Sequence, residues 1–196
     1  MGLDEQLLHP ERLWMRCEVL GRPSAVPDAP GVYAWYFDEV PGIVPVDECH
    51  TLGEWAMLYA GISPKEPSRS GGKPSSQTLR TRLRYHFRGN AYGSTLRLTL
   101  GSLLASELGI QLRRVGSGTR LTFADGESVL SGWMDQHARV CWVSDPAPWI
   151  IETSLIQTRT LPLNLSQNAH SAFRAELSGL RRDQRYLARS LPVVHT

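Results

Sequence analysis

The pattern of apolar and polar positions along the chain predicts a small number of β-strands. Residues 31–37 (GVYAWYF) combine β-branched and aromatic side chains, and residues 55–61 (WAMLYAG) form a second short apolar run. Both runs lie beside segments that contain proline and glycine, as strands bounded by turns do. A third strand is expected over 139–143, where apolar and polar residues alternate before Asp145-Pro146. If the first two strands form a hairpin, their tyrosines can face a common helix.

Helical periodicity is clearest over residues 77–87, where Leu79, Leu83 and Phe87 recur every four residues and form one apolar seam. Capping residues and breakers predict further helices along the chain. The expected helices are 77–87 (cap Ser75 or Ser76, end at Gly89), 95–108 (cap Ser94, end at Gly109), 126–138 (cap Asp125), 148–159 (Pro148 in the first turn) and 172–190. A short helix is also expected to begin near Pro10, and a hairpin is expected around 116–118.

These helices and strands follow one another without the regular β–α–β order of a doubly wound sheet. We therefore expect an α+β fold, in which a small mixed or antiparallel β-sheet is flanked by helices. The length of 196 residues fits one domain, and 41% apolar and 20% charged residues are typical of globular proteins. Residues 63–75 are rich in proline, serine and glycine, which predicts a mobile loop.

Three features of the composition bear on the cellular setting. No apolar run approaches the roughly 20 residues that cross a bilayer, so no membrane partner is expected. The first residues (MGLDE) are acidic and lack the apolar core of a signal peptide. Cys17, Cys49 and Cys141 are odd in number and far apart, which excludes a CxxC metal knuckle and favours a reducing compartment. We therefore expect a cytoplasmic protein.

Positive charge is concentrated in the middle of the chain, although the net charge is only +2. Residues 1–66 hold 11 acidic and 4 basic side chains, residues 67–120 hold 1 and 10, and residues 121–196 hold 7 of each. The central segment would attract a polyanion. Of the 21 basic residues, 19 are arginine, whose planar fork suits phosphate. A GC-rich genome would also favour arginine over lysine, but it would not produce the clustering.

The most basic of the expected helices carries arginine on two faces. Arg80, Arg84 and Arg88 recur every four residues and form a stripe, which either contacts phosphates or is solvated surface. Arg82 lies about 200° from Arg80 around the helix, and His86 follows it by one turn on the same face. This helix therefore presents a stripe on one side and an Arg82–His86 pair on the other.

Four further residues are candidates for chemistry, and each also has an ordinary structural interpretation. Tyr33 and Tyr59 lie in the first two predicted strands, where tyrosines most often serve in packing. Glu152 lies in a mostly apolar helix, where an unpaired buried carboxylate is costly, so we expect it to cap the helix or to bind a ligand. Asn164 follows that helix, and taken alone it would be a turn residue.

Five short motifs that contain these residues occur in a fixed order along the chain. They are GVY at 31–33, YAG at 59–61, RLRYH at 82–86, ETSLI at 152–156 and PLN at 162–164. No single motif is specific, but their order and local spacing are. In these motifs the chain resembles the GIY-YIG endonuclease family over roughly residues 30–168.

The resemblance implies an organisation in three parts. Residues 1–29 form a lead-in, residues 30–168 form the nuclease-like domain, and residues 169–196 form a basic C-terminal helix packed on the same domain. Within the domain, an insertion of helix, hairpin and helix is expected over about 89–147, because this stretch is longer than in the smallest members. The segment between the first two motifs, about 34–58, is also longer than in the repair-type members. Both long segments and the terminal helix are expected to select the target.

The resemblance also assigns catalytic positions, residue by residue. The implied catalytic residues are Tyr33, Tyr59, Arg82, His86, Glu152 and Asn164. Glu152 is the implied ligand of a divalent cation, Mg²⁺ or Mn²⁺. The chain departs from the family at Ile62, where many members have a lysine. Either Lys65 or Lys73 replaces it, or the site needs no lysine.

The implied function is an endonuclease that hydrolyses DNA phosphodiester bonds with a metal ion, either as a homodimer or by sequential nicks. Arginines outside the catalytic set are expected to contact the DNA backbone without reading bases. These residues are Arg80, Arg84, Arg88, Arg113 and Arg114. One alternative is a catalytically inactive nucleic-acid-binding protein with the same fold. Another is an unrelated α+β domain, in which Tyr33, Tyr59, Arg82 and Glu152 would not converge.

Overall fold

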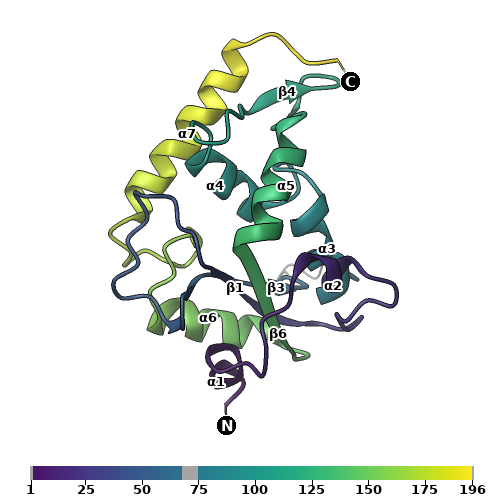
Figure 1. The fold of residues 1–196 in the computed structure, drawn as a ribbon, viewed down its shortest axis with the longest axis vertical. Helices are drawn as coiled ribbons and strands as arrows, with labels where there is room; N and C mark the ends of the chain where they lie inside the picture. Colours follow the sequence, from purple (N-terminus) through teal and green to yellow (C-terminus); the bar gives the residue numbers. More distant parts are fainter. Residues whose placement is uncertain (1, 68–74, 196) are drawn as a thin grey trace.

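The computed structural model describes residues 2–67 and 75–195, and its centre is a four-stranded antiparallel sheet (Figure 1). Across the sheet the strands are β2 (Thr51–Leu52), β3 (Trp55–Ser63), β1 (Gly31–Phe37) and β6 (Ala138–Ser144). β1 pairs with both long strands, so that Tyr33 lies opposite Gly61 on one side and Trp142 on the other. The three strands and the hairpin pairing expected from the sequence are confirmed.

Helices cover both faces of this sheet, and β1 is therefore buried along its whole length. The helices are α1 (Leu3–Leu8), α2 (Arg16–Leu20), α3 (Leu79–Arg88), α4 (Thr95–Leu103), α5 (Gly126–His137), α6 (Pro148–Thr158) and α7 (Arg174–Ser190). On one face, Tyr33 and Trp35 share a core cluster with the apolar seam of α3. On the other face, Val32 and Tyr36 share a second cluster with α1 and α6. The antiparallel sheet between helices confirms the expected fold class.

The helix that carries the arginines begins two residues later than expected, at Leu79. Its cap is Thr78 rather than Ser75 or Ser76, because the Thr78 hydroxyl accepts a hydrogen bond from the Thr81 amide. The same hydroxyl donates to Asp28 Oδ1 at 2.7 Å, which joins the cap to the lead-in. The expected end at Gly89 is confirmed.

The segment that follows contains helix α4, the hairpin of β4 (Arg113–Val115) and β5 (Arg120–Thr122), and helix α5. Ser94 caps α4 as expected, but the helix ends at Leu103 instead of residue 108. Asp125 stands at the cap position of α5 without a side-chain hydrogen bond, because its own backbone is already helical. These elements occupy the stretch for which we expect an insertion; its status relative to other members stays a prediction.

A buried ion pair fastens this segment to the rest of the domain. Arg97 of α4 is fully buried and donates from Nε and Nη2 to Glu127 Oε2 of α5, at 2.8 and 2.6 Å. Its Nη1 also donates to the carbonyl of His86 at 3.2 Å, at the end of α3. Glu127 Oε1 accepts the amides of Ala91 and Phe123. One arginine thus joins three helices around the position of His86.

The lead-in differs from the expectation, because a helix beginning near Pro10 is wrong. α1 ends at Leu8 and α2 begins at Arg16. Between them, Trp14 exchanges two backbone hydrogen bonds with Val140 of β6, at 2.9 and 3.1 Å, and its ring stacks on Trp142. β6 is the last strand of the sheet, so its outer edge offers unpaired backbone groups that this extended segment satisfies.

The C-terminal third follows the sequence prediction closely. α6 begins at Pro148, and α7 begins at Arg174 and runs along one flank of the molecule (Figure 1). Of the mobile loop expected over 63–75, Ser63 belongs to β3, and residues 68–74 lie outside the described residues. Within the described ranges, no helix is both long and apolar enough to span a membrane.

Candidate active site

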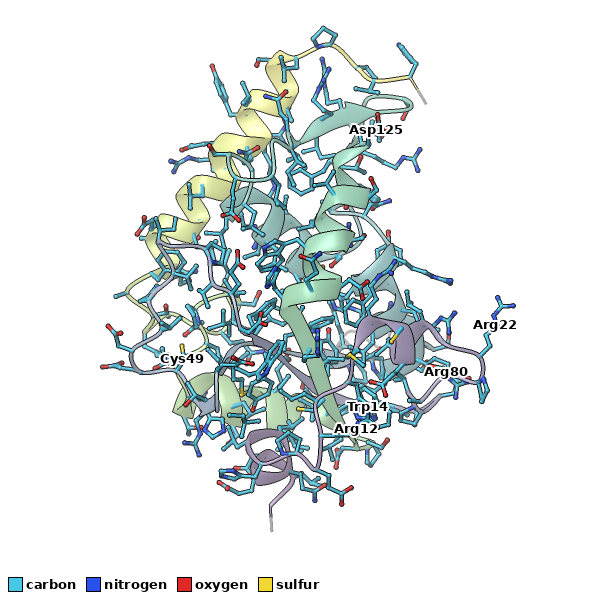
Figure 2. All side chains as sticks on the ribbon, viewed as in Figure 1. Arg12, Trp14, Arg22, Cys49, Arg80 and Asp125 are labelled. Atoms are coloured by element: carbon cyan, nitrogen blue, oxygen red, sulfur yellow. The ribbon has the colours of Figure 1, made fainter. Side chains whose placement is uncertain are left out.

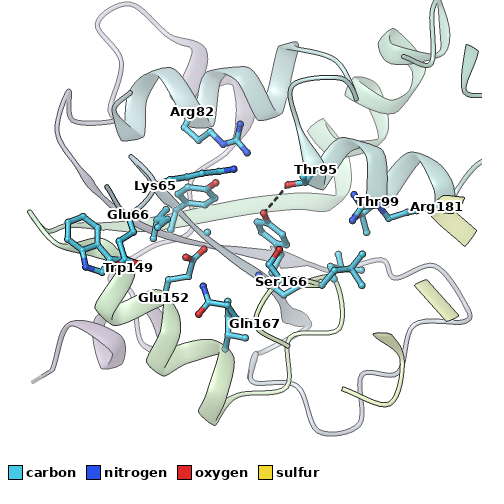
Figure 3. Close-up of a pocket in the computed structure, with 18 residues that line it drawn as sticks. Lys65, Glu66, Arg82, Thr95, Thr99, Trp149, Glu152, Ser166, Gln167 and Arg181 are labelled. Atoms are coloured by element: carbon cyan, nitrogen blue, oxygen red, sulfur yellow. Dashed lines mark hydrogen bonds between the residues drawn. The ribbon is translucent and has the colours of Figure 1, made fainter. Parts of the chain in front are cut away.

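A pocket of about 610 Å³ lies beside β3, where side chains from α3, α4, α6 and α7 meet (Figure 3). Its polar lining consists of Tyr33, Tyr59, Lys65, Glu66, Arg82, Thr95, Thr99, Glu152, Asn164, Ser166, Gln167 and Arg181. Five of the six predicted catalytic residues are in this lining, and the sixth, His86, is hydrogen-bonded to one of them. Residues from five separate motifs are therefore brought to one place.

Tyr33 contributes its phenol to the pocket, and the glycine opposite it in β3 makes room for the ring. A Cβ atom built on Gly61 would lie 2.7 Å from Tyr33 Oη and 2.8 Å from Cζ. The residue is buried, which raises the pKa of the phenol, while the nearby charge of Arg82 lowers it. Burial prevails, so the Tyr33 side chain is neutral around neutral pH in the protein alone.

His86 lies behind Tyr33 and connects it to a serine. The Tyr33 hydroxyl is 2.9 Å from His86 Nε2, and His86 Nδ1 is 2.7 Å from Ser94 Oγ. The imidazole is fully buried. Burial lowers its pKa far below the usual value, and the charges of Arg82 and Arg97 lower it further. His86 is therefore neutral, with one nitrogen donating and the other accepting.

Tyr59 of β3 and Arg82 of α3 also line the pocket. The Tyr59 hydroxyl lies 3.4 Å from Thr95 Oγ1 of α4, and burial raises the pKa of this phenol as well. Arg82 Nη1 donates to the carbonyl of Gly93 at 2.9 Å, and this hydrogen bond holds the guanidinium in place. Arg82 thus supplies a fixed positive charge near both tyrosines, and this charge opposes the rise in pKa that burial causes in each phenol.

Glu152 directs its carboxylate into the pocket from α6 (Figure 3). The helix is anchored against the sheet by Leu155 and Ile156, and this places Glu152, one turn earlier, at the rim. Among the described residues, the carboxylate has no hydrogen-bond or ion-pair partner. Burial raises its pKa to about 7, against an opposing contribution from Lys65. A half-buried carboxylate without a partner is suited to binding a cation.

The donor set at Glu152 restricts the kind of ion that fits. Over residues 2–67 and 75–195, no group of three or more histidine, cysteine, aspartate or glutamate side chains could hold a metal ion. An ion at Glu152 would therefore take most of its ligands from water and from a bound substrate. Mg²⁺ commonly binds in this way, through one or two carboxylates and phosphate oxygens.

Asn164 lies deeper and fixes the edge of β3. Its Oδ1 accepts the Ala60 amide at 2.9 Å, and its Nδ2 donates to the Ala60 carbonyl at 2.8 Å. The Leu163 amide also donates to the carbonyl of Leu58. The side-chain amide thus takes the place of a neighbouring strand's peptide group beside the YAG motif. This position explains how a residue far along the chain determines where Tyr59 and Gly61 lie.

The arginine stripe of α3 lies outside the pocket, on the side of the lead-in. Arg80 Nε donates to the carbonyl of Val26 at 2.8 Å, and Arg84 Nη1 donates to that of Gly21 at 3.3 Å. Figure 2 shows Arg80 and Arg22 on the same flank of the molecule. Burial, and also the charges of Arg88, Arg22 and Arg80, lower the pKa of Arg84. These residues form a basic surface that is separate from the pocket.

Arg113 and Arg114 also lie away from the pocket, on the hairpin. Arg113 Nη2 donates to the carbonyl of Pro192 at 3.1 Å, and Arg114 Nη2 donates to that of Leu191 at 2.7 Å. Both guanidinium groups therefore hold the segment that follows α7. In the structure both arginines therefore bind within the protein, and their contact with nucleic acid stays a prediction.

Sequence reasoning did not single out Thr95 or Arg181 as residues of the site, although it named Lys65 as a possible substitute. Arg181 had a recognisable signal. Leu177 and Ala188 lie on the buried face of α7, which Phe173 precedes at the N-cap, and Arg181 occupies the same face between them. Thr95 had none, because its position opposite Tyr59 depends on how α4 packs.

Comparison with known proteins agrees with this geometry. The family model described as the GIY-YIG catalytic domain matches residues 31–183, which include all the pocket residues named above. No curated protein and no solved structure matches the chain. The match begins at the GVY motif and ends two residues beyond Arg181. The chain belongs to the GIY-YIG family.

Proposed function

We propose that this protein is a metal-dependent endonuclease that hydrolyses phosphodiester bonds in DNA. Membership of the GIY-YIG family supports nuclease activity. The observation that carries the proposal is the shared pocket of Tyr33, Tyr59, Arg82 and Glu152, in which both phenols experience the charges of Arg82 and Glu152. A cation-binding carboxylate and a fixed guanidinium around one space suit a phosphodiester in the act of hydrolysis.

Glu152 would hold the divalent cation, Mg²⁺ or Mn²⁺. The unpartnered, half-buried carboxylate fits such an ion, since its negative charge is otherwise uncompensated. When bound, the ion stabilises negative charge on the phosphate and on the leaving oxygen. Lys65 lies close enough to lower the pKa of Glu152, so it is the candidate to supply the charge that is missing at Ile62.

Tyr33 would orient the attacking water and, once its own phenol proton has been released to solvent, would accept a proton from that water as the phenolate. The phenolate that this requires is favoured by the charge of Arg82 and by a hydrogen bond from His86. In this arrangement Ser94 donates to His86 Nδ1, and Nε2–H of the neutral imidazole donates to Tyr33 Oη. A second proton on His86 is disfavoured by burial and by Arg82 and Arg97. We therefore assign His86 the positioning of Tyr33 rather than the acceptance of its proton.

The remaining polar groups would hold the phosphate and the chain around it. Arg82 would donate to a non-bridging phosphate oxygen, where a charge-assisted hydrogen bond is strongest. Tyr59 would contact the same phosphate, and Asn164 would keep the β3 edge in place through Ala60. The arginine stripe would lie along the DNA backbone, together with the hairpin arginines. These proposed backbone contacts are Arg80, Arg84, Arg88, Arg113 and Arg114.

A nicking assay on supercoiled plasmid tests the proposal. We expect relaxed circles with Mg²⁺, none with a chelator, and none with the variant Glu152→Gln, which should still bind DNA. The matched control is Glu66→Gln, which removes the other carboxylate of the pocket lining. Full nicking by Glu152→Gln would contradict the metal role of Glu152.

The second candidate is a nucleic-acid-binding protein of the same fold without catalysis. Ile62, in place of the lysine that many members carry, favours it. The same assay separates the two, because an inactive protein would retard DNA on a gel but leave the plasmid supercoiled at every Mg²⁺ concentration. A wild-type protein that nicks would exclude this alternative.

A further inference from the structure

Arg181 is a buried cation without a counterion. It lies on the apolar face of α7 and is 9% exposed. Its Nε is buried without a hydrogen-bond partner, and no described carboxylate forms an ion pair with its guanidinium. Arg97, which is also buried, is by contrast bound by Glu127. A buried arginine is costly unless it is paired, so Arg181 lacks a partner that its position requires.

The guanidinium of Arg181 faces the catalytic pocket. The side chain belongs to the pocket lining with Thr95 and Thr99 of α4 (Figure 3). Arg181 and Tyr59 are close enough for each to alter the pKa of the other. In Figure 3, Arg181 lies at the opposite end of the pocket from Trp149 and Glu66. In the same view it lies beside Thr99, apart from Arg82 and Glu152.

The missing partner must be an anion. Burial lowers the pKa of Arg181, and the neighbouring charge of Arg185 lowers it further, so positive charge around this side chain exceeds what the protein compensates. The hydroxyls of Thr95 and Thr99 add hydrogen-bond donors on the same side of the pocket. A guanidinium flanked by hydroxyls matches the oxygens of a phosphate.

We propose that Arg181, with Thr95 and Thr99, forms a second phosphate subsite, which holds the DNA phosphate next to the scissile one. This proposal rests on the proposed function, because it takes the scissile phosphate to lie between Arg82 and Glu152. A DNA strand carries a phosphate on each side of the cleaved bond, so a strand that follows the pocket past Tyr59 brings one to Arg181. The subsite would fix the direction of the strand through the site.

Replacement of the arginine tests the subsite by binding rather than by cleavage. All proteins carry Glu152→Gln, so that a fluorescein-labelled DNA duplex stays intact, and Kd is measured over a range of salt concentrations. Arg181→Met keeps the apolar stem and removes the charge. We expect roughly tenfold weaker binding and a salt slope smaller by about 0.9, the value of one phosphate contact.

Arg182→Met is the matched control. It removes the same charge one residue later, where the side chain is 76% exposed and lies beside Asp183. We expect this variant to change neither Kd nor the salt slope by a comparable amount. Equal effects of the two substitutions would overturn the proposal, because they would reflect general attraction to a basic helix.

Duplexes with one neutral methylphosphonate locate the contact. The position of the cut is first mapped with wild-type protein and Mg²⁺. Neutralising the phosphate beside the cut should weaken binding by the protein with Arg181, and should have no further effect on Arg181→Met. A loss of the same size in both proteins would place that phosphate elsewhere and overturn the proposal.

Thermal unfolding supplies an independent readout. Because Arg181 is unpaired, Arg181→Met should unfold at the same or a higher temperature than the parent protein. An unfolded or strongly destabilised variant would show that Arg181 has a structural partner, and would contradict the subsite. Absence of plasmid nicking by the wild type, with the difference between the two arginine variants intact, would instead contradict only the proposed function.

Discussion

At the scale of single residues, the site depends on close approach between strand and ring. Gly61 is required because the Tyr33 phenol occupies the space that a side chain at this position would fill. Gly31 is required because a Cβ atom there would meet Leu79 of α3 and the Val143 carbonyl. The two glycines of the motif thus determine how closely β1 approaches its neighbours and where its tyrosine points. Neither has the left-handed backbone that usually explains a glycine in a turn.

Substitution of Gly61 by alanine should therefore act through Tyr33. The added methyl lies 2.7 Å from Tyr33 Oη, and the buried ring has little room to yield. We expect a loss of about 1–3 kcal/mol in the free energy of unfolding and a fall of at least about tenfold in the nicking rate. Gly132→Ala, in a helix with open space around it, is the control and should leave both unchanged or raise stability. Unaltered nicking by Gly61→Ala would contradict this role.

The raised pKa of Glu152 should appear in the pH dependence of stability. In the metal-free folded protein the carboxyl has a pKa of about 7, above its ordinary value of 4.5, so the folded state holds a proton that the unfolded state has lost. Its contribution to stability is complete below about 4.5, declines as pH rises, and is lost above about 7. Urea unfolding with a chelator should show this decline in the wild type relative to Glu152→Gln. Parallel pH profiles would argue against the buried, unpartnered carboxylate.

At the scale of the elements, α4 and α5 are integral to the core rather than an appended module. Arg97 of α4 binds Glu127 of α5 and also donates to the carbonyl of His86, so both helices are fastened to the helix that carries Arg82 and His86. Because Ser94 both caps α4 and contacts His86, the start of this helix also sets the position of the imidazole. The elements of this segment thus support the proposed catalytic residues directly.

Removal of Glu127 should be strongly destabilising. Glu127→Ala leaves the buried guanidinium of Arg97 without its carboxylate, which costs about 3–5 kcal/mol in the free energy of unfolding. Asp125→Ala is the control, since Asp125 is exposed and makes no capping hydrogen bond. Chemical denaturation of the two variants measures the difference. A loss below about 1 kcal/mol for Glu127→Ala would mean that the helices are held by apolar packing alone.

Variants of the arginine stripe separately test the proposed contacts to the DNA backbone. Arg80→Ala combined with Arg84→Ala should weaken DNA binding mainly at higher salt and reduce the salt slope by about 0.9 for each phosphate lost. Both arginines also hold backbone carbonyls of the lead-in, so thermal unfolding must be measured beside binding. An unchanged salt slope would assign the stripe to that structural role only.

At the scale of the whole molecule, the motifs predicted the strands and the residues of the site better than they predicted contacts between distant parts of the chain. Tyr33, Arg82 and Glu152 could be named because each lies in a short motif whose local structure the sequence determines. The pairing of Trp14 with Val140 could not be predicted, since it depends on an open edge of the folded sheet. Arg181 was missed for a similar reason: its burial follows from the packing of α7, although its place among apolar residues of that helix was visible.

The nicking rate of Tyr33→Phe, compared with that of Tyr36→Phe, tests the central claim most directly. Both changes remove one oxygen from the same strand, but Tyr33 lies in the pocket, whereas the Tyr36 hydroxyl donates to the Leu7 carbonyl on the opposite face. We predict that Tyr33→Phe loses about 10²–10⁴ in rate, as a missing general base does, while Tyr36→Phe stays close to the wild type. Equal rates for the two variants would contradict the assignment of this pocket as the site of hydrolysis.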